Sequence, residues 1–290
     1  MKIILFSRVR VTHNASDIKL ILSLIERYGF DYCVNEEFAA IIEKCTGFKT
    51  PLAKQYGRRV GEQPHPSVMV CYGGDGTLLE GVERLGGQPI VVAGINSGRL
   101  GFLTTTSPSG IEHLFELIAT SRLKSQKRTM LNVEGDFAPA ESSLATNEFS
   151  VQRLGASMIS VDTYVDSELV ATYYGDGVVV ATPTGSTAYS LSAGGPIVAP
   201  RCGCLIISPI APHNLTMRPV VVPSSSTIEM HIHMREGDAY LCLDNRSYNI
   251  NGSSRVKITK AKESLYLAQR EGSSFYQTLR EKMMWGVDIR

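Results

Sequence analysis

The chain carries the pentapeptide Gly73-Gly74-Asp75-Gly76-Thr77 between an apolar run, residues 68–72, and a segment of helical periodicity, residues 78–85. This order predicts a strand, a tight glycine-rich turn and the start of a helix. Backbone N–H groups at a helix start favour anions, and glycine lets the backbone come close to a ligand. We therefore interpret Gly73, Gly74, Gly76 and Thr77 as a phosphate loop.

The carboxylate of Asp75 is unexpected in this loop because it would repel a phosphate. A metal ion between the two groups removes the conflict, and so does a role in which Asp75 accepts the proton of the attacking hydroxyl. The pattern is not a P-loop, which needs Lys followed by Ser or Thr, and it lacks the third glycine of the dinucleotide fingerprint. A tight turn that needs glycine only for its conformation is the alternative.

Length and composition describe a globular protein. A length of 290 residues favours two domains, and 43% apolar with 20% charged residues is an ordinary soluble composition. The net charge of +1 gives no argument for electrostatic binding to nucleic acid or to an anionic membrane. No apolar run approaches the roughly 20 residues of a membrane span. Six scattered cysteines show no zinc spacing. We expect a cytoplasmic protein without a nucleic-acid or membrane partner.

Strand and helix patterns alternate over the first part of the chain. Apolar strands are expected at residues 3–6, 68–72 and 89–95, and helices at residues 17–28, 36–45, 78–85 and 110–121. Ser16 is expected to cap the first helix, and the polar residues 46–66 predict a loop or a poorly ordered excursion. Such alternation predicts an α/β domain over residues 1–128, with a parallel sheet covered by helices.

The pattern changes to period-two alternation near Thr129. Runs rich in β-branched and aromatic residues, among them 159–165, 227–234 and 254–259, predict an all-β domain over residues 129–269. The tail changes again, because Phe275, Leu279 and Met283 recur at helical spacing. We expect residues 270–290 to pack back onto the first domain.

A second unusual segment follows Gly175-Asp176-Gly177 and a short apolar strand, residues 178–180. Residues 182–196 read TPTGSTAYSLSAGGP, a run of small hydroxyl residues and glycine. Such a run lets the backbone lie against a planar or phosphorylated ligand, with hydroxyl and N–H groups as hydrogen-bond partners. A Ser/Thr/Gly-rich surface loop is the alternative, although this run continues into an apolar stretch rather than a linker.

Three segments together make the chain resemble the NAD kinase family: residues 73–77, the pair Asn147-Glu148, and residues 175–197. The pentapeptide is shared with diacylglycerol and sphingosine kinases, whereas the 175–197 segment is highly specific. Residues 96–103 and 212–219 also resemble family segments, so the likeness covers most of the chain from about 68 to 223. It implies a Rossmann-like α/β first domain, a β-rich second domain and a tail that returns to the first.

The resemblance implies transfer of the γ-phosphate of ATP to the 2′-hydroxyl of the adenosine ribose of NAD, giving NADP. Asp75 would be the catalytic proton acceptor, with Gly76 beside the substrate and Phe102 near the reacting end. Asn147 and Glu148 would bind NAD, Glu148 by accepting hydrogen bonds from ribose hydroxyls. Asp176 would face the nicotinamide half. Thr187, Ala188, Tyr189, Ser190, Leu191 and Ser192 would line the adenosine pocket.

The resemblance further implies a divalent metal, usually magnesium, and a homo-oligomer, either a dimer or a tetramer. It assigns no metal ligand beyond the open question of Asp75. The cation that contacts the transferred phosphate is also open, since Tyr174 stands where many relatives carry Arg. Arg153 and Arg246 are candidates for it. The competing functions are a lipid kinase of the diacylglycerol type and a non-catalytic nucleotide-binding regulator that binds NAD without making NADP.

Overall fold

The computed structural model describes residues 1–98, 101–137, 142–234, 238–269, 272 and 274–286. Its internal contacts divide the chain into two units, one of residues 1–127 with 265–290 and one of residues 128–264. Each is considered by itself below. The first unit is α/β and the second is built of antiparallel sheets, the fold class expected from the sequence.

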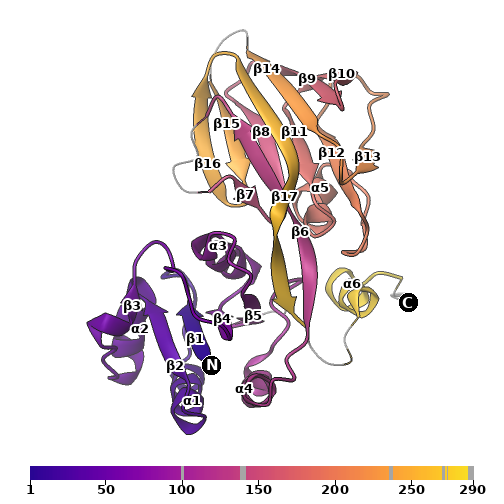
Figure 1. Cartoon of the computed structure of the whole chain (residues 1–290). Helices are drawn as coiled ribbons and strands as arrows, with labels where there is room; N and C mark the ends of the chain where they lie inside the picture. Colours follow the sequence, from indigo (N-terminus) through magenta and orange to yellow (C-terminus); the bar gives the residue numbers. More distant parts are fainter. Residues whose placement is uncertain (99–100, 138–141, 235–237, 270–271, 273, 287–290) are drawn as a thin grey trace. The chain divides into compact units, whose positions relative to one another are not determined.

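The first unit is built on a parallel sheet (Figure 1). Its strands are ordered β5-β4-β1-β2-β3, and the last residues of β17 pair in parallel with β5 at the open edge. Their bounds are β1 Lys2–Phe6, β2 Asp31–Asn35, β3 Gln55–Tyr56, β4 Ser67–Tyr72 and β5 Val91–Ile95. Every residue of β4 is buried, as a central strand covered on both faces requires.

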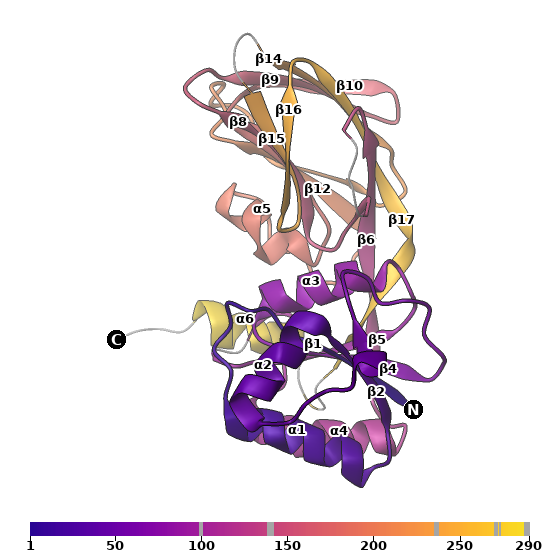
Figure 2. The same ribbon diagram turned by 90° about the vertical axis from the view of Figure 1, so that its left-hand side faces the viewer.

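Helices cover both faces of this sheet. Side chains of α1 Ala15–Arg27, α2 Glu36–Thr46 and α4 Ile111–Ala119 share one core with Ile3, Leu5, Val68 and Val70. The opposite face carries α3 Asp75–Leu85, where a Cβ at Gly81 would lie 2.5 Å from Cys71 Sγ. Glycine at that position therefore allows close helix–strand packing. Figure 2 shows α1 and α4 lying together on one side of the strands and α3 on the other.

Several local expectations for the first unit were wrong. Residues 46–66 are not merely a loop, because they contain a 3₁₀ turn, Leu52–Lys54, and β3. The pattern also missed β2, in which a short apolar run of Tyr32, Cys33 and Val34 lies between the polar residues Asp31 and Asn35. The N-cap of α1 is Asn14 rather than Ser16, and its side chain accepts a hydrogen bond from the Ser16 N–H. Asn and Ser are equally good caps, so composition could not decide between them.

The second unit holds two antiparallel sheets packed on one core. One is ordered β10-β9-β14-β17 and the other β13-β12-β11-β8-β15-β16. Val161 and Met230 from the first sheet share a core with Val151, Val180 and Leu241 from the second. The bounds are β8 Glu148–Leu154, β9 Ile159–Val165, β10 Glu168–Gly175, β11 Gly177–Ala181, β12 Cys204–Ile210, β13 Val220–Pro223, β14 Ile228–Met234, β15 Asp238–Leu243 and β16 Arg246–Asn251.

Strands β6 Ser125–Gly135 and β17 Ser254–Ala268 carry the chain between the units, and β7 Leu144–Ala145 pairs with β6. Strand β17 pairs with β14 through Ile258 and with β5 through Tyr266 and Leu267. The buried positions of β17 change from even to odd residues between Ile258 and Ala261, and the contacts change units after Ser264. Helix α6 Phe275–Met283 follows, with Ser274 as its N-cap. Within the described residues, no helix has the length and apolar character that crossing a bilayer requires.

Candidate functional site

The pentapeptide forms the expected turn at the carboxyl end of β4. The Gly73 N–H donates to the carbonyl of Ile95 at 2.8 Å. Gly73 has a φ of 147°, and a Cβ there would lie 2.5 Å from the Thr77 hydroxyl oxygen. Glycine at this position is therefore a steric requirement. Helix α3 begins at Asp75, so its first N–H groups belong to residues 75–77 of the predicted phosphate loop.

Asp75 is joined to the segment that follows β5. Its Oδ2 accepts a hydrogen bond from the Phe102 N–H at 2.7 Å. Its Oδ1 accepts from the N–H groups of Leu103 and Thr104, at 3.1 and 2.8 Å, and from the Thr104 hydroxyl at 2.8 Å. The structure thus brings together two residues that the resemblance assigned to the reacting end, Asp75 and Phe102. Of the 96–103 segment, residues 99–100 lie outside the described part.

Gly101 is fitted to this carboxylate. A Cβ at residue 101 would fall 1.8 Å from Asp75 Oδ1, closer than any non-bonded contact allows. The Thr104 hydroxyl also accepts a hydrogen bond from the Asn96 side-chain amide at 2.9 Å. Residues 96–104 are therefore organised around Asp75. The sequence identified both segments but gave no sign that the carboxylate links them.

Arg8 lies beside the same turn, and sequence reasoning missed it. A Cβ at Gly76 would lie 3.1 Å from Arg8 Nη1. Arg8 Nε pairs with Glu80 Oε2 at 2.5 Å, and Arg84 Nη2 pairs with Glu80 Oε1 at 2.7 Å. Burial would raise the pKa of Glu80, but the hydrogen bonds from Arg84 and Arg8 outweigh burial and lower it. The ionised Glu80 fixes a cation next to Gly76. The place of Arg8 in the sequence could have indicated this contact. Arg8 follows the carboxyl end of β1, and β1 is the parallel neighbour of β4, which the phosphate loop follows.

The second group of predicted residues lies where β8 begins and its two antiparallel neighbours, β11 and β15, end. Glu148 begins β8 and pairs with Ala181, the last residue of β11. On the other side of β8, Phe149 pairs with Leu243 at the end of β15. The Thr182 N–H donates to the Asn147 carbonyl at 2.8 Å. Residues 146–148, 182–192 and the turn after β15 are thus brought together within the second unit.

Asn147 and Glu148 present buried acceptors without partners. Among the described residues, neither Asn147 Oδ1 nor Glu148 Oε2 has a hydrogen-bond partner, and both atoms are shielded from solvent. Burial raises the pKa of Glu148 to about 8, helped by the negative charge of Asp244 and opposed by a hydrogen bond from the Tyr189 N–H. Unsatisfied buried acceptors are rare in folded proteins. A ligand with hydroxyl donors would satisfy them.

Asp244, in the turn after β15, supports this pair, and the sequence did not single it out. Its Oδ2 accepts from the Thr146 N–H at 2.7 Å, and its Oδ1 accepts from the N–H groups of Asn147 and Glu148 at 2.7 and 3.1 Å. The Asp244 N–H donates in return to the Glu148 carbonyl at 2.9 Å. No motif in the sequence marks this carboxylate, because its partners lie about a hundred residues away.

The segment 182–192 packs closely on residue 147. A Cβ at Gly185 would lie 2.1 Å from the Asn147 carbonyl oxygen. The Tyr189 hydroxyl donates to Gln152 Oε1 at 3.2 Å. Ser190 differs from its neighbours, since its side chain is fully buried and shares a hydrogen bond with Ser208. The side chains of this segment that are open to solvent, wholly or in part, are those of Thr187, Ala188, Tyr189, Leu191 and Ser192.

Both arginine candidates for a phosphate contact already have partners. Arg153 Nε pairs with Asp176 Oδ1 at 2.6 Å. Arg246 donates to the carbonyl of Ser142 at 2.6 Å and to that of Leu144. Arg246 therefore ties the chain before residue 146 to β16, and Arg153 neutralises the carboxylate predicted to face nicotinamide. Neither arrangement supports a role in phosphate transfer.

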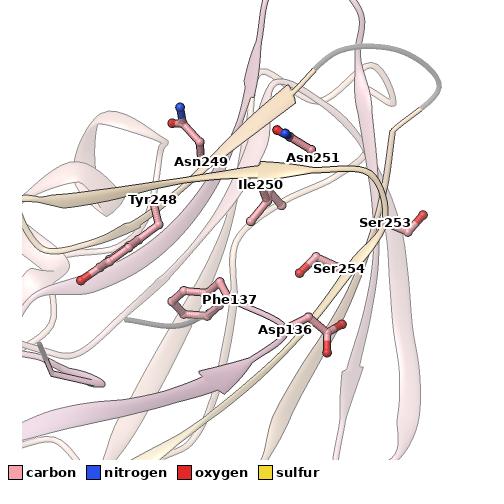
Figure 3. A pocket seen from close by; sticks show the side chains of 8 residues that line it. All are labelled: Asp136, Phe137, Tyr248, Asn249, Ile250, Asn251, Ser253 and Ser254. Carbon is pink, nitrogen blue, oxygen red and sulfur yellow. The ribbon is translucent and has the colours of Figure 1, made fainter. Parts of the chain in front are cut away.

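The second unit also has a cavity that includes none of the predicted residues (Figure 3). Its volume is about 390 Å³, and it is lined by Asp136, Phe137, Tyr248, Asn249, Ile250, Asn251, Ser253 and Ser254. The rings of Phe137 and Tyr248 pack at 5.6 Å between centroids. Among the described residues that line it, only Asp136 has a charged side chain. This cavity is distinct from both groups of predicted site residues.

Comparison with known proteins finds matches over most of the chain. The family model for the ATP-NAD kinase N-terminal domain matches residues 30–123, and the model for the ATP-NAD kinase C-terminal domain matches residues 146–270. An NAD kinase of Cytophaga hutchinsonii is 35% identical over 96% of this chain and 95% of its own length. An NAD kinase of Bacteroides fragilis is 33% identical, with both chains covered in full.

Solved structures show the same relationship. A yeast NADH kinase complexed with NADH superposes with a TM-score of 0.84 and 25% identity, covering 100% of this chain and 89% of that one. An NAD kinase of Archaeoglobus fulgidus in complex with ATP superposes with a TM-score of 0.74 and 27% identity, covering 98% and 99%. The chain belongs to the NAD kinase family.

Proposed function

We infer that the chain catalyses the ATP-dependent phosphorylation of NAD, moving the γ-phosphate of ATP to the 2′-hydroxyl of the adenosine ribose. One observation carries the dinucleotide assignment: the buried, unpartnered acceptors Asn147 Oδ1 and Glu148 Oε2. These two atoms have no donor among the described residues, and the hydroxyl groups of a bound ribose would donate hydrogen bonds to them. Family membership supports the phosphate donor, since a solved relative is an NAD kinase in complex with ATP.

Asp75 is assigned as the proton acceptor. Its Oδ2 accepts a single hydrogen bond from the described residues, that of the Phe102 N–H, so a lone pair is left for the substrate hydroxyl. The ribose oxygen bonds to the γ-phosphorus, the bond from phosphorus to the β–γ bridging oxygen breaks, and ADP leaves. The hydroxyl proton passes to Asp75. Hydrogen bonds from residues 102–104 hold the carboxylate in one orientation for this transfer.

Phosphate charge is neutralised by the start of α3 and by Arg8. Of the phosphate-loop residues, Gly73 and Thr77 already donate their N–H groups to the carbonyls of Ile95 and Gly74, so phosphate is assigned to the N–H groups of Gly74 and Gly76. Arg8 Nη1 lies against Gly76. Among the described residues, no three His, Cys, Asp or Glu side chains form a metal cluster. Magnesium in kinases needs only one or two carboxylates besides phosphate oxygens. Asp75 would hold the ion only in place of its role as proton acceptor, because Oδ1 already accepts three hydrogen bonds and Oδ2 one. The ion would supply further charge neutralisation.

The remaining assignments concern the ends of the dinucleotide. Asp176 is proposed to face the nicotinamide half, with its charge balanced by Arg153. The adenosine pocket is assigned to Thr187, Ala188, Tyr189, Leu191 and Ser192, while Ser190 supports the segment through Ser208. Tyr189 presents an aromatic ring that is partly open to solvent and able to stack on the base.

Compartment and assembly complete the proposal. All six cysteines are free thiols, which fits a reducing cytoplasm. A homo-oligomer is proposed from the family resemblance, and the edge strand β10 exposes Leu169 and Val170, 52% and 40% accessible. An uncovered apolar edge strand is a site for pairing with another copy. Light scattering on the purified protein would distinguish a monomer from a dimer or tetramer.

One assay tests the function against its alternatives. The purified protein is incubated with ATP and magnesium together with NAD, NADH or a diacylglycerol dispersion, and NADP is measured with an NADP-specific dehydrogenase. NADP formation that requires both ATP and NAD is the expected result. Lipid phosphorylation without NADP would favour the lipid kinase. Tight NAD binding without NADP would favour a regulator.

A further inference from the structure

We propose that Asp244 is a positioning residue of the dinucleotide site, which orients the Asn147-Glu148 pair by binding the backbone beneath it. This inference rests on the proposed function. Asp244 lies in a two-residue turn between β15 and β16 and is partly buried. The hydrogen bonds that its carboxylate accepts from the described residues come from the backbone N–H groups of residues 146–148.

The hydrogen bonds of Asp244 are directed at one segment. Three consecutive N–H groups, those of Thr146, Asn147 and Glu148, donate to its two oxygens at 2.7, 2.7 and 3.1 Å. The Glu148 carbonyl accepts the return bond from the Asp244 N–H. Residues 146–148 precede and begin β8, so the ladder of β8 does not by itself set their orientation. Asp244 supplies that constraint.

The backbone conformation of Asp244 indicates that its side chain, and not the turn, accounts for an aspartate at this position. Its φ is 52°, in the left-handed region that non-glycine residues rarely adopt. Glycine or asparagine would fit such a turn more easily. The carboxylate explains the aspartate at this position, because aspartate is the short side chain in which two oxygens can both accept hydrogen bonds. Residues held in this way concentrate at functional sites.

Asp244 also influences the charge of Glu148. Its negative charge, after burial, is the second cause of the raised pKa of Glu148. The Tyr189 N–H donates to Glu148 and opposes the rise of its pKa. Arg246 affects Glu148 only indirectly, because its positive charge lowers the pKa of Asp244. Cys242 and Asp176 influence Tyr189, as Glu148 itself does. Removing the Asp244 charge should therefore shift the pH at which Glu148 ionises to lower values.

The test uses Asp244→Asn in the full-length enzyme. The asparagine oxygen still accepts from Asn147 and Glu148, but its NH₂ group then faces the Thr146 N–H, a donor against a donor. We expect the KM for NAD to rise about tenfold, the factor for one lost buried hydrogen bond, with the KM for ATP unchanged. The acid limb of kcat/KM for NAD should move to lower pH, which general destabilisation would not cause.

The matched control is Asp166→Asn, since Asp166 also lies at positive φ and accepts one backbone N–H, that of Thr227. It should leave both KM values and the pH profile unchanged. In the double variant Glu148→Gln/Asp244→Asn, the second substitution should raise the NAD KM by less than Asp244→Asn does in the wild type, because part of the effect of Asp244 is exerted through residue 148. Asp244→Gly, which suits the positive φ, repeats the test without the donor clash.

The outcomes separate this inference from the proposed function. A wild-type enzyme that makes no NADP would overturn the function and this inference with it. A wild-type enzyme that makes NADP, with Asp244→Asn and Asp244→Gly indistinguishable from Asp166→Asn in NAD KM and pH profile, would overturn the role of Asp244 alone. Equal rises in the NAD and ATP KM values would likewise identify Asp244 as a merely structural residue.

Discussion

Thr104 donates two hydrogen bonds to the same oxygen of Asp75, one from its backbone N–H and one from its hydroxyl, each at 2.8 Å. The carboxylate in the phosphate loop is therefore the attachment point for the segment after the next strand. An acid that seemed a repulsion problem in the sequence has a structural task as well as a proposed chemical one. Substitutions can separate the two tasks, because some remove the proton acceptor and others alter only the hydrogen bonds to the carboxylate.

Asp75→Asn should lower kcat by at least about 10², the lower end of general-base contributions. The amide cannot accept the ribose proton, and its NH₂ group would face one of the N–H groups of residues 102–104. Thr104→Val is the matched control, because it removes one hydrogen bond to Asp75 and keeps the carboxylate. Its kcat should fall far less. Steady-state kinetics with saturating NAD and ATP measure both, and near-normal turnover of Asp75→Asn would refute the assignment.

Gly101→Ala should abolish activity and lower the melting temperature. The new methyl group would lie 1.8 Å from Asp75 Oδ1 and 2.4 Å from the Thr104 hydroxyl oxygen, so the segment must move away from the carboxylate. Gly98→Ala is the control in the same segment, since its nearest neighbour would be 3.9 Å away. That variant should keep near-normal activity. Thermal unfolding and NADP formation measured on both variants test the fit, and an active Gly101→Ala enzyme would contradict it.

The NAD KM should depend on pH through Glu148. Its pKa is raised to about 8 by burial and by the charge of Asp244, so the carboxyl is protonated at neutral pH without ligand. Ribose hydroxyls donate to the ionised form, which means that binding releases a proton below pH 8. The KM for NAD should then rise about tenfold for each pH unit below 8 until the bound-state pKa is reached. Glu148→Gln should have a higher but flatter NAD KM.

The same shift affects the stability of the unliganded protein. A carboxyl whose folded pKa lies above its unfolded value of 4.5 stabilises the fold most at low pH. That stability is lost as the pH rises from about 4.5 to 8, on the order of a few kcal/mol. Glu148→Gln should lack this loss, so its free energy of unfolding should increase relative to that of the wild type as the pH rises. Denaturant titrations of both proteins at pH 5 and pH 8 measure the difference. Glu168→Gln, an exposed carboxyl on β10, is the control. Parallel pH profiles for wild type and Glu148→Gln would reject the shift.

Local sequence predicted the elements that carry strong periodicity. The helices at α1, α2, α3 and α4 and the strands at β1, β4, β9 and β14 follow from apolar spacing. The short β2 and β3 do not, because they are held by pairing with distant strands rather than by their own pattern. The same reason explains the missed site residues. Asp244 and Arg8 act on segments 60 or more residues away, and no local pattern encodes that proximity.

Arg8 should be the cation that contacts the donor phosphates. Its guanidinium is fixed beside Gly76 of the predicted phosphate loop by its ion pair with Glu80. Arg8→Ala should raise the KM for ATP about tenfold, in line with the loss of a charge-assisted hydrogen bond, with a smaller effect on the KM for NAD. Arg8→Lys should recover part of the loss, since lysine keeps the charge but not the fork.

The control for this prediction is Arg27→Ala, an exposed arginine in the last turn of α1 that stacks on Tyr28. It should leave both KM values unchanged. Increasing the ionic strength should weaken ATP binding of the wild type more than that of Arg8→Ala, because the variant has one fewer cation to screen. Initial rates at several ATP and salt concentrations give both numbers. An Arg8→Ala enzyme with the ATP KM and salt dependence of the wild type would remove Arg8 from the donor site and leave the helix start and the metal as the groups that neutralise the phosphates.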